Sequence, residues 1–121
     1  MLTVLGIAAV VLFNVSMRRH TEAHQAAALR DDLAAMRKAI RQYRVAHGHY
    51  PASLNDMVPD ELRKIPFDPI TKSGDTWHFT LRENVRVDDF TSTSATAPAE
   101  IVDVHSGATG HDSKGQAWSD Y

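Results

Sequence analysis

Cysteine is absent from this chain of 121 residues, so the protein has no disulfide framework and no thiolate metal site. A secreted head would need another source of stability, such as a long helix, a bound cation or neighbouring subunits. Charge is absent from residues 1–17, and the first acidic residue is Glu22. Aromatic residues make up 7% of the chain and form no stacking surface among the basic residues, as strand binding would need. We therefore expect no nucleic-acid partner.

A long hydrophobic run is also missing. The apolar stretch at residues 1–13 falls short of the about 20 residues that a stand-alone transmembrane helix needs. It is unlike a secretory signal peptide, because no basic residue precedes it and no small-residue cleavage site follows. The basic pair Arg18-Arg19 comes after it, which taken literally would keep the next segment in the cytoplasm. We expect a basic leader and a few further residues to precede Met1 in the native protein.

Apolar residues recur at helical spacing beyond the arginine pair. Steps of 3, 4, 3, 4 and 3 residues separate the members of this stripe: Ala26, Leu29, Leu33, Met36, Ile40 and Tyr43. Gly48 is suited to a helix end, and Pro51 prevents continuation. The pattern predicts one helix over residues 1–47, roughly 70 Å long, with its stripe packed on its own head. A coiled coil is less favoured, because about two heptads are too few.

The two signs of charge are segregated along the chain. Seven Lys and Arg residues against three acids give residues 18–44 a charge of +4, whereas six against twelve give residues 45–121 a charge of -6. Such asymmetry fits nucleic-acid binding by the basic part or stacking of copies, basic helix against acidic head. Because no aromatic surface lies among the basic residues, the charge pattern favours contacts between copies of the chain over nucleic-acid binding.

The remainder of the chain predicts a small head. Residues 53–56 have the pattern of a capped short helix, and three prolines at 59, 66 and 69 indicate a rigid connector. Alternation over residues 77–82 predicts a strand with Trp77, Phe79 and Leu81 on a buried face. Further strands are expected near residues 85–87 and 101–104, a polar loop at 91–97, and an anchoring role for Trp118. The fold class is therefore α+β: a long helix on a small antiparallel sheet.

Taken in order, these features resemble a known family. The carrying segments are residues 5–9 (LGIAA), 29–33 (LRDDL), 40–43 (IRQY), 48–51 (GHYP), 53–54 (SL), 62–69 (LRKIPFDP), Trp77, 102–107 (VDVHSG), Trp118 and Tyr121. The whole chain is similar to type IV pilin-like proteins, most of all to the major (G-type) pseudopilins of type II secretion. The family has a glutamate at the fifth position of the mature protein. The fifth residue here is Leu5, and no acidic residue precedes Glu22. Asn14 lies near the family's helix-kinking proline, and Ile70-Thr71 replaces the usual Trp-Gly after Asp68-Pro69.

The resemblance implies a filament subunit with three parts. Residues 1–17 would be a transmembrane or filament-core helix, residues 18–48 its amphipathic continuation, and residues 49–121 a periplasmic head. The implied partners are copies of itself in a helical filament, minor pseudopilins, the inner-membrane assembly platform, and membrane lipid before assembly. The assembly residues are those of the apolar face: Leu2, Leu5, Gly6, Ala9, Val11, Leu12 and Phe13.

The same resemblance implies a calcium site in the acidic C-terminal loop. Its candidate ligands are Asp103, Ser106 and Asp112, with Asp120 as a further donor, since calcium takes six to eight oxygens. No other cofactor is expected. A zinc site is disfavoured because His20 and His24, or His47, His49, His105 and His111, lack a ligand motif. Asp68 is expected to fix a turn.

No enzyme activity is expected. Asp103, His105 and Ser106 are not a catalytic triad, since nothing presents the serine on a strained elbow and neighbouring strand residues point to opposite faces. The leading interpretation is a subunit of a secretion pseudopilus or a related type IV pilus, located in the inner membrane and then in a filament. The alternative is a membrane-anchored periplasmic module that binds a ligand through its Asp- and His-rich tail.

Overall fold

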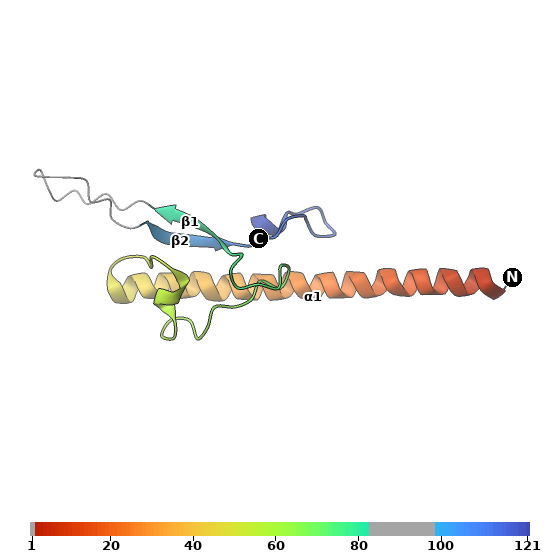
Figure 1. The fold of residues 1–121 in the computed structure, drawn as a ribbon, viewed down its shortest axis with the longest axis horizontal. Helices are drawn as coiled ribbons and strands as arrows, with labels where there is room; N and C mark the ends of the chain where they lie inside the picture. The colour runs from red at the N-terminus through yellow and green to blue at the C-terminus, as the bar shows by residue number, and fades with distance from the viewer. Residues whose placement is uncertain (1, 83–98) are drawn as a thin grey trace, which may run out of the picture.

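One long helix dominates the molecule (Figure 1). The computed structural model describes residues 2–82 and 99–121, apart from the side chains at positions 2, 3, 18 and 19. Helix α1 (Leu2–His47) has 46 residues and at 1.5 Å per residue is ~69 Å long. It ends at Gly48, whose φ is +78° and whose amide donates to the Arg44 carbonyl at 2.8 Å. The predicted continuous helix and its glycine stop are confirmed.

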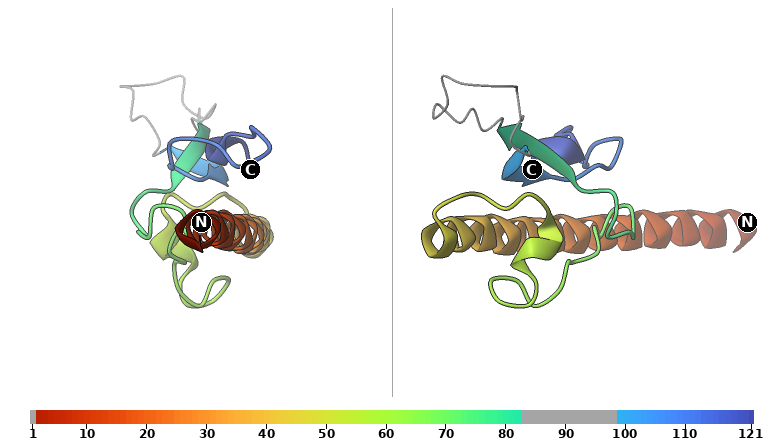
Figure 2. Two further views of the ribbon diagram at one scale, coloured as in Figure 1. Left: turned by 90° about the vertical axis from the view of Figure 1, so that its right-hand side faces the viewer. Right: turned by 60° about the vertical axis from the view of Figure 1, so that its left-hand side comes forward.

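A small head lies along the C-terminal half of α1 (Figures 1 and 2). Its elements are the 3₁₀ helix η1 (Leu54–Met57), strands β1 (His78–Arg82) and β2 (Glu100–His105), and the 3₁₀ helix η2 (Trp118–Asp120). The strands are antiparallel, with His78 opposite His105 and one irregularity of register after Thr80. The predicted α+β class is confirmed. The strand expected near residues 85–87 and the loop at 91–97 lie outside the described residues.

The first turn after the helix follows the predicted cap. An Asp56 carboxylate oxygen accepts the amides of Ala52 at 3.1 Å and Ser53 at 3.2 Å, which stabilises the start of η1. The turn of η1 carries Leu54 and Met57 into the core. The capped short helix expected from the sequence is therefore present.

The core forms where the helix stripe meets the head. All six predicted stripe residues are buried, together with Ala39 of the same helix. The head supplies the opposing side chains: Leu54, Met57, Leu62, Trp77, Ile101, Val104, Ala108 and Trp118. Only residues from Ala26 onward take part, so the head covers α1 over its second half and leaves the first half outside.

The prediction of a buried face on β1 is wrong for Phe79 and Leu81. Trp77 is buried just before the strand, but every residue of β1 is exposed. The reason is the order of the layers: β2 is the strand that contacts α1, and its Ile101 and Val104 fill the core. The apolar side chains of β1 point toward an open hollow of the head instead.

Candidate functional site

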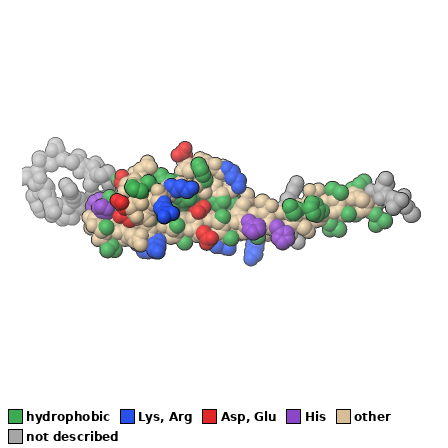
Figure 3. All heavy atoms as spheres, turned by 90° about the horizontal axis from the view of Figure 1, so that it is seen from below, with side chains coloured by type: hydrophobic (Ala, Val, Ile, Leu, Met, Phe, Trp, Pro, Cys, Tyr) green, Lys and Arg blue, Asp and Glu red, His purple; other side chains and the backbone are tan. Residues whose placement is uncertain are grey.

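The first part of α1 is a helix with apolar side chains on every side. Every residue from 4 to 17 is exposed, and Figure 3 shows hydrophobic side chains gathered around this end of the molecule. The large ones are Val4, Leu5, Ile7, Val10, Val11, Leu12, Phe13, Val15 and Met17. Consecutive positions are 100° apart around a helix, so this set leaves no polar face. We call residues 4–17 the apolar segment.

The polar side chain of Asn14, within the apolar segment, is hydrogen-bonded inside the helix. The Asn14 side-chain amide donates to the Val10 carbonyl at 2.9 Å, so it needs no outside partner for that bond. Just beyond the segment, the Thr21 hydroxyl donates to the Met17 carbonyl at 2.9 Å. Such bonds lower the cost of placing these side chains in apolar surroundings. The helix runs through Asn14 without a break.

The assembly residues expected from the sequence lie in or beside this segment. Leu5, Gly6, Ala9, Val11, Leu12 and Phe13 are all exposed, and the side chain of Leu2 is outside the described part. At Gly6 an added Cβ would meet no atom within 4 Å among the described residues, so close packing within that part of the chain does not require a glycine there. Among the described residues, no helix has both the length and the hydropathy needed to cross a membrane.

Asp103 belongs to a cluster of hydrogen bonds and ion pairs around Arg37 that joins α1 to the head. It lies on β2 and not on a flexible loop, and its Oδ1 accepts Arg37 Nε at 2.9 Å. The same guanidinium also donates to the carbonyls of Val104 at 2.9 Å and Tyr121 at 2.8 Å. His105 Nε2 lies 3.4 Å from the other Asp103 oxygen.

These contacts set the protonation of Asp103. Burial acts to raise its pKa, but the Val104 amide, the Arg37 guanidinium and His105 outweigh that effect and hold the pKa below the usual range. Arg37 was not expected from the sequence to have this role. The only signal was its place beside the stripe residue Met36, which brings it to the edge of the buried face.

Ser106 lies in the interior of the head. It is fully buried, and its hydroxyl donates to Asp68 Oδ2 at 2.5 Å and accepts the Ala108 amide at 3.1 Å. Asp68 is also fully buried, and its Oδ1 accepts the amide of Ile70 at 2.8 Å. The turn predicted for Asp68 is therefore present, with an additional role: its carboxylate joins the proline-rich connector to the segment after β2.

Asp112 is held by the tail that contains it. The Tyr121 hydroxyl donates to its Oδ2, and its Oδ1 accepts the amides of Lys114 at 2.8 Å and Gln116 at 3.0 Å. The tyrosine hydrogen bond is the main reason that the pKa of Asp112 is lowered, and the same bond raises the pKa of Tyr121. Arg30 of α1 lies 5.0 Å from the centre of the Tyr121 ring, which docks the tail onto the helix.

The calcium ligands expected from the sequence do not fit one site in this arrangement. Ser106 is buried against Asp68, Asp103 binds Arg37, and Asp112 binds Tyr121. Asp120 is exposed in η2. Within residues 2–82 and 99–121, no group of three or more His, Asp or Glu side chains is placed to hold a metal ion.

The histidines are spread over separate places. His20 and His24 are exposed on α1. His47 and His49 lie together at the end of the helix, with ring centres 6.1 Å apart. His105 belongs to the cluster around Arg37. The backbone of His111 forms an isolated antiparallel bridge with Ala117 in the tail.

The carboxylate of Asp32 on α1 lowers the stability of the fold at neutral pH. Burial, followed by the nearby carboxylates of Asp31 and Asp68, raises the pKa of Asp32 above its usual value. The native state therefore binds this proton more tightly than the unfolded chain, so the contribution of Asp32 to stability falls as pH rises through the native pKa. We expect Asp32→Asn to raise the free energy of unfolding at pH 7 by about 1 kcal/mol or less, because Asp32 is partly solvated.

Thermal unfolding by circular dichroism checks this prediction. The gain should shrink as pH is lowered toward 3, where Asp32 is protonated in both states. Asp60→Asn is the control, because Asp60 is an exposed carboxylate of the head and is not one of the groups that raise the pKa of Asp32. A gain that is equal at pH 3 and pH 7 would assign the effect to something other than ionisation.

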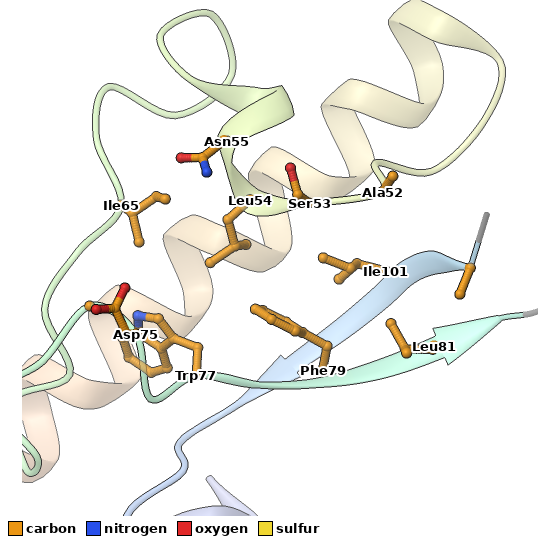
Figure 4. A pocket seen from close by; sticks show the side chains of 12 residues that line it. Ala52, Ser53, Leu54, Asn55, Ile65, Asp75, Trp77, Phe79, Leu81 and Ile101 are labelled. Atoms are coloured by element: carbon orange, nitrogen blue, oxygen red, sulfur yellow. The ribbon is translucent and has the colours of Figure 1, made fainter.

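The head also carries an open hollow of about 440 Å³ (Figure 4). Leu54, Ile65 and Ile101 line it together with the exposed Phe79 and Leu81 of β1. Among the described residues that line it, Asp75 is the one ionisable residue. The described lining is mostly apolar, and its polar side chains are those of Ser53, Asn55 and Asp75.

Comparisons with known proteins add no family to this description. No protein-family model matches the chain, and searches of curated proteins and of solved structures find no match. The function is therefore inferred from the geometry of the chain itself.

Proposed function

We propose that this protein is a pilin-like structural subunit that polymerises into a filament, a type II secretion pseudopilus or a related type IV pilus-like fibre, and so supports protein secretion. The observation that carries the proposal is the apolar segment. It projects from a head whose core is complete without it, and it is exposed throughout. Exposed apolar surface of this extent marks an interaction site or an aggregation hazard.

The distribution of the apolar side chains favours several neighbours over one. A helix that meets a single partner needs one apolar stripe and keeps a polar face in water. The apolar segment has no polar face, so one partner helix would leave large side chains such as Leu5 and Phe13 in solvent. A bundle of copies surrounds it completely, and a helical filament supplies such a bundle by repeating one heterologous contact.

Charge supports the same arrangement. Lys38 and Arg41 are exposed on the outer face of the basic part of α1, while Asp60 and Asp75 are exposed on the head. With +4 on residues 18–44 and -6 on residues 45–121, copies stacked along a filament axis place opposite charges against each other. Before assembly, the apolar segment would rest in the inner membrane with the head in the periplasm, where minor pseudopilins and the assembly platform are the expected partners.

Assembly of the purified full chain tests the proposal. The protein is purified in detergent, the detergent is removed, and the sample is examined by sedimentation and negative-stain electron microscopy. We expect filaments of uniform width in the pellet, with assembly weakened by salt because opposite surface charges are screened. A chain that stays monomeric in lipid vesicles would contradict polymerisation, and ligand binding through its tail would then favour the membrane-anchored binding module.

A further inference from the structure

Glu61 has a buried carboxylate oxygen to which no described residue donates. Its amide donates to the Met57 carbonyl at 3.0 Å, in the turn where the chain after η1 folds back along α1 (Figure 1). The side chain is 11% exposed, and Oε2 is buried without a hydrogen bond in the part of the chain that the structure describes. A buried carboxylate oxygen costs free energy unless a hydrogen bond, an ion pair or a metal ion compensates it. Glu61 is therefore a candidate metal ligand.

The imidazole of His47 faces this carboxylate from the last turn of α1. His47 Nε2 lies 3.6 Å from Glu61 Oε1, which is too long for a hydrogen bond. Two donors on one tetrahedral Zn²⁺ ion, each about 2.1 Å from the metal, lie about 3.4 Å apart. Among the described side chains, no Lys or Arg forms an ion pair with Glu61. The two side chains thus have nearly the separation of ligands that share a metal ion.

A second imidazole lies beside His47 with one ring nitrogen free. Gly48, with a φ of +78°, turns the chain at the helix end, and the ring centre of His49 lies 6.1 Å from that of His47. His49 Nδ1 lies 3.0 Å from the Tyr50 carbonyl. A carbonyl oxygen only accepts, so Nδ1 carries the proton and Nε2 keeps its lone pair. Metal-binding histidines are commonly held by a backbone carbonyl in this way.

A small movement of His49 completes the ligand set. Two imidazole rings on one tetrahedral Zn²⁺ ion have their centres about 5 Å apart, about 1 Å closer than these two rings. His49 is exposed, so its ring can turn, whereas Tyr43 packs on the His47 ring with centres 4.1 Å apart. The three side chains are therefore not yet a complete group of ligands in the chain without metal. We infer that His47, His49 and Glu61 bind one Zn²⁺ ion, with water as the fourth ligand.

The surrounding charges and the donor types favour zinc. Burial, and after it the carboxylates of Asp56 and Glu61, raise the pKa of Tyr43, so two negative charges act close to the ring that packs on His47. Two imidazoles and one carboxylate suit Zn²⁺, whereas Ca²⁺ takes six to eight oxygens. The site is thus separate from the calcium site expected in the C-terminal loop. No spacing motif marks it in the sequence, because the fold brings Glu61 to the histidines.

A zinc ion at this position would join the end of α1 to the head. Its ligands come from the last turn of the helix, from the residue after Gly48 and from the turn after η1. Such a link would stabilise a head that has no cysteine for a disulfide. The site lies at the opposite end of α1 from the apolar segment, so it does not depend on polymerisation (Figure 1).

Zinc titration of the full chain tests the inference. The protein is stripped with EDTA, transferred to detergent buffer without chelator, and titrated with ZnCl₂ by calorimetry and by thermal unfolding. We expect the Tm of the head to rise by roughly 10 °C when free zinc is a hundredfold above its Kd. CaCl₂ at the same concentration should leave the Tm unchanged.

Single variants assign the ligands. His47→Gln and Glu61→Gln should each lower the zinc affinity at least tenfold and remove most of the rise in Tm. His49→Gln changes an exposed side chain and should weaken binding equally, which keeps the test valid if either of the other variants does not fold. His24→Gln, at an exposed histidine of α1 outside the site, is the matched control and should keep the natural affinity.

Several results would overturn the inference. These are a Tm that zinc does not raise, an unchanged affinity in His49→Gln, and a loss in His24→Gln as large as in the site variants. Zinc-dependent dimers in detergent, seen by analytical ultracentrifugation, would place the ligands on two chains and would also overturn it. Filament assembly is measured separately without zinc, so none of these results bears on the proposed polymerisation.

Discussion

Replacing Leu5 or Val11 with arginine is expected to abolish assembly and leave the head folded. The two side chains are 71% and 54% exposed in the isolated chain, so they contribute nothing to the core of the head. In a filament the same positions would be surrounded by apolar side chains of neighbours. A charged arginine at the centre of an apolar layer costs about 3 kcal/mol on insertion scales. At 1.4 kcal/mol per factor of ten, this raises the concentration needed for assembly about a hundredfold or more.

The measurement is the amount of protein in the pellet after detergent removal, together with circular dichroism of the soluble fraction. Val45→Arg is the matched control, because Val45 is also an exposed valine on α1 and lies outside the apolar segment. It should assemble as the natural chain does. Normal filaments from Leu5→Arg and Val11→Arg would sink the proposal that this segment forms the filament core.

Gly107→Ala is expected to have the largest effect on the stability of the head. A Cβ at this position would lie 1.9 Å from the Thr76 carbonyl oxygen and 3.1 Å from His78 Cδ2. A backbone carbonyl cannot turn aside as a flexible side chain can, so the chain before β1 has to move. That movement disturbs Ser106, whose hydroxyl is buried on Asp68 next to the substituted residue. Overpacking of this kind costs about 3 kcal/mol, a large share of the about 5–15 kcal/mol that stabilises a small domain.

Urea denaturation followed by tryptophan fluorescence measures this loss, because Trp77 and Trp118 are buried in the core. Gly74→Ala is the matched control: its Cβ would make an ordinary 3.6 Å contact with Phe67, and the expected change is within about 1 kcal/mol. Equal stability of the two variants would mean that the approach of Gly107 to Thr76 relaxes without cost.

The two predictions concern separate parts of one chain. The arginine variants change a surface that only other copies can cover, whereas Gly107→Ala changes a contact within the head. Loss of assembly should therefore leave the unfolding transition unchanged. A glycine variant that still folds at low temperature should retain the apolar segment and its ability to assemble.

The sequence by itself determined the long helix and the face it buries. A period of 3.6 residues from Ala26 to Tyr43 and a left-handed stop at Gly48 are local signals, and local geometry is enough to place them. The cap at Ser53 and Asp56 is equally local. The sequence also showed that residues 1–17 carry no charged side chain, which indicates a surface that other molecules cover.

Only the tertiary structure decided which polar residues act together. Arg37 meets Asp103 across 66 positions of sequence, and Ser106 meets Asp68 across 38. Residue type and spacing cannot show such pairs, because they arise when β2 is laid on α1. For the same reason the sequence suggests Ser106 as a calcium ligand, whereas in the structure its buried hydroxyl donates to Asp68. The sequence also predicts the apolar face of β1 to be buried, whereas β2 is the strand that fills the core.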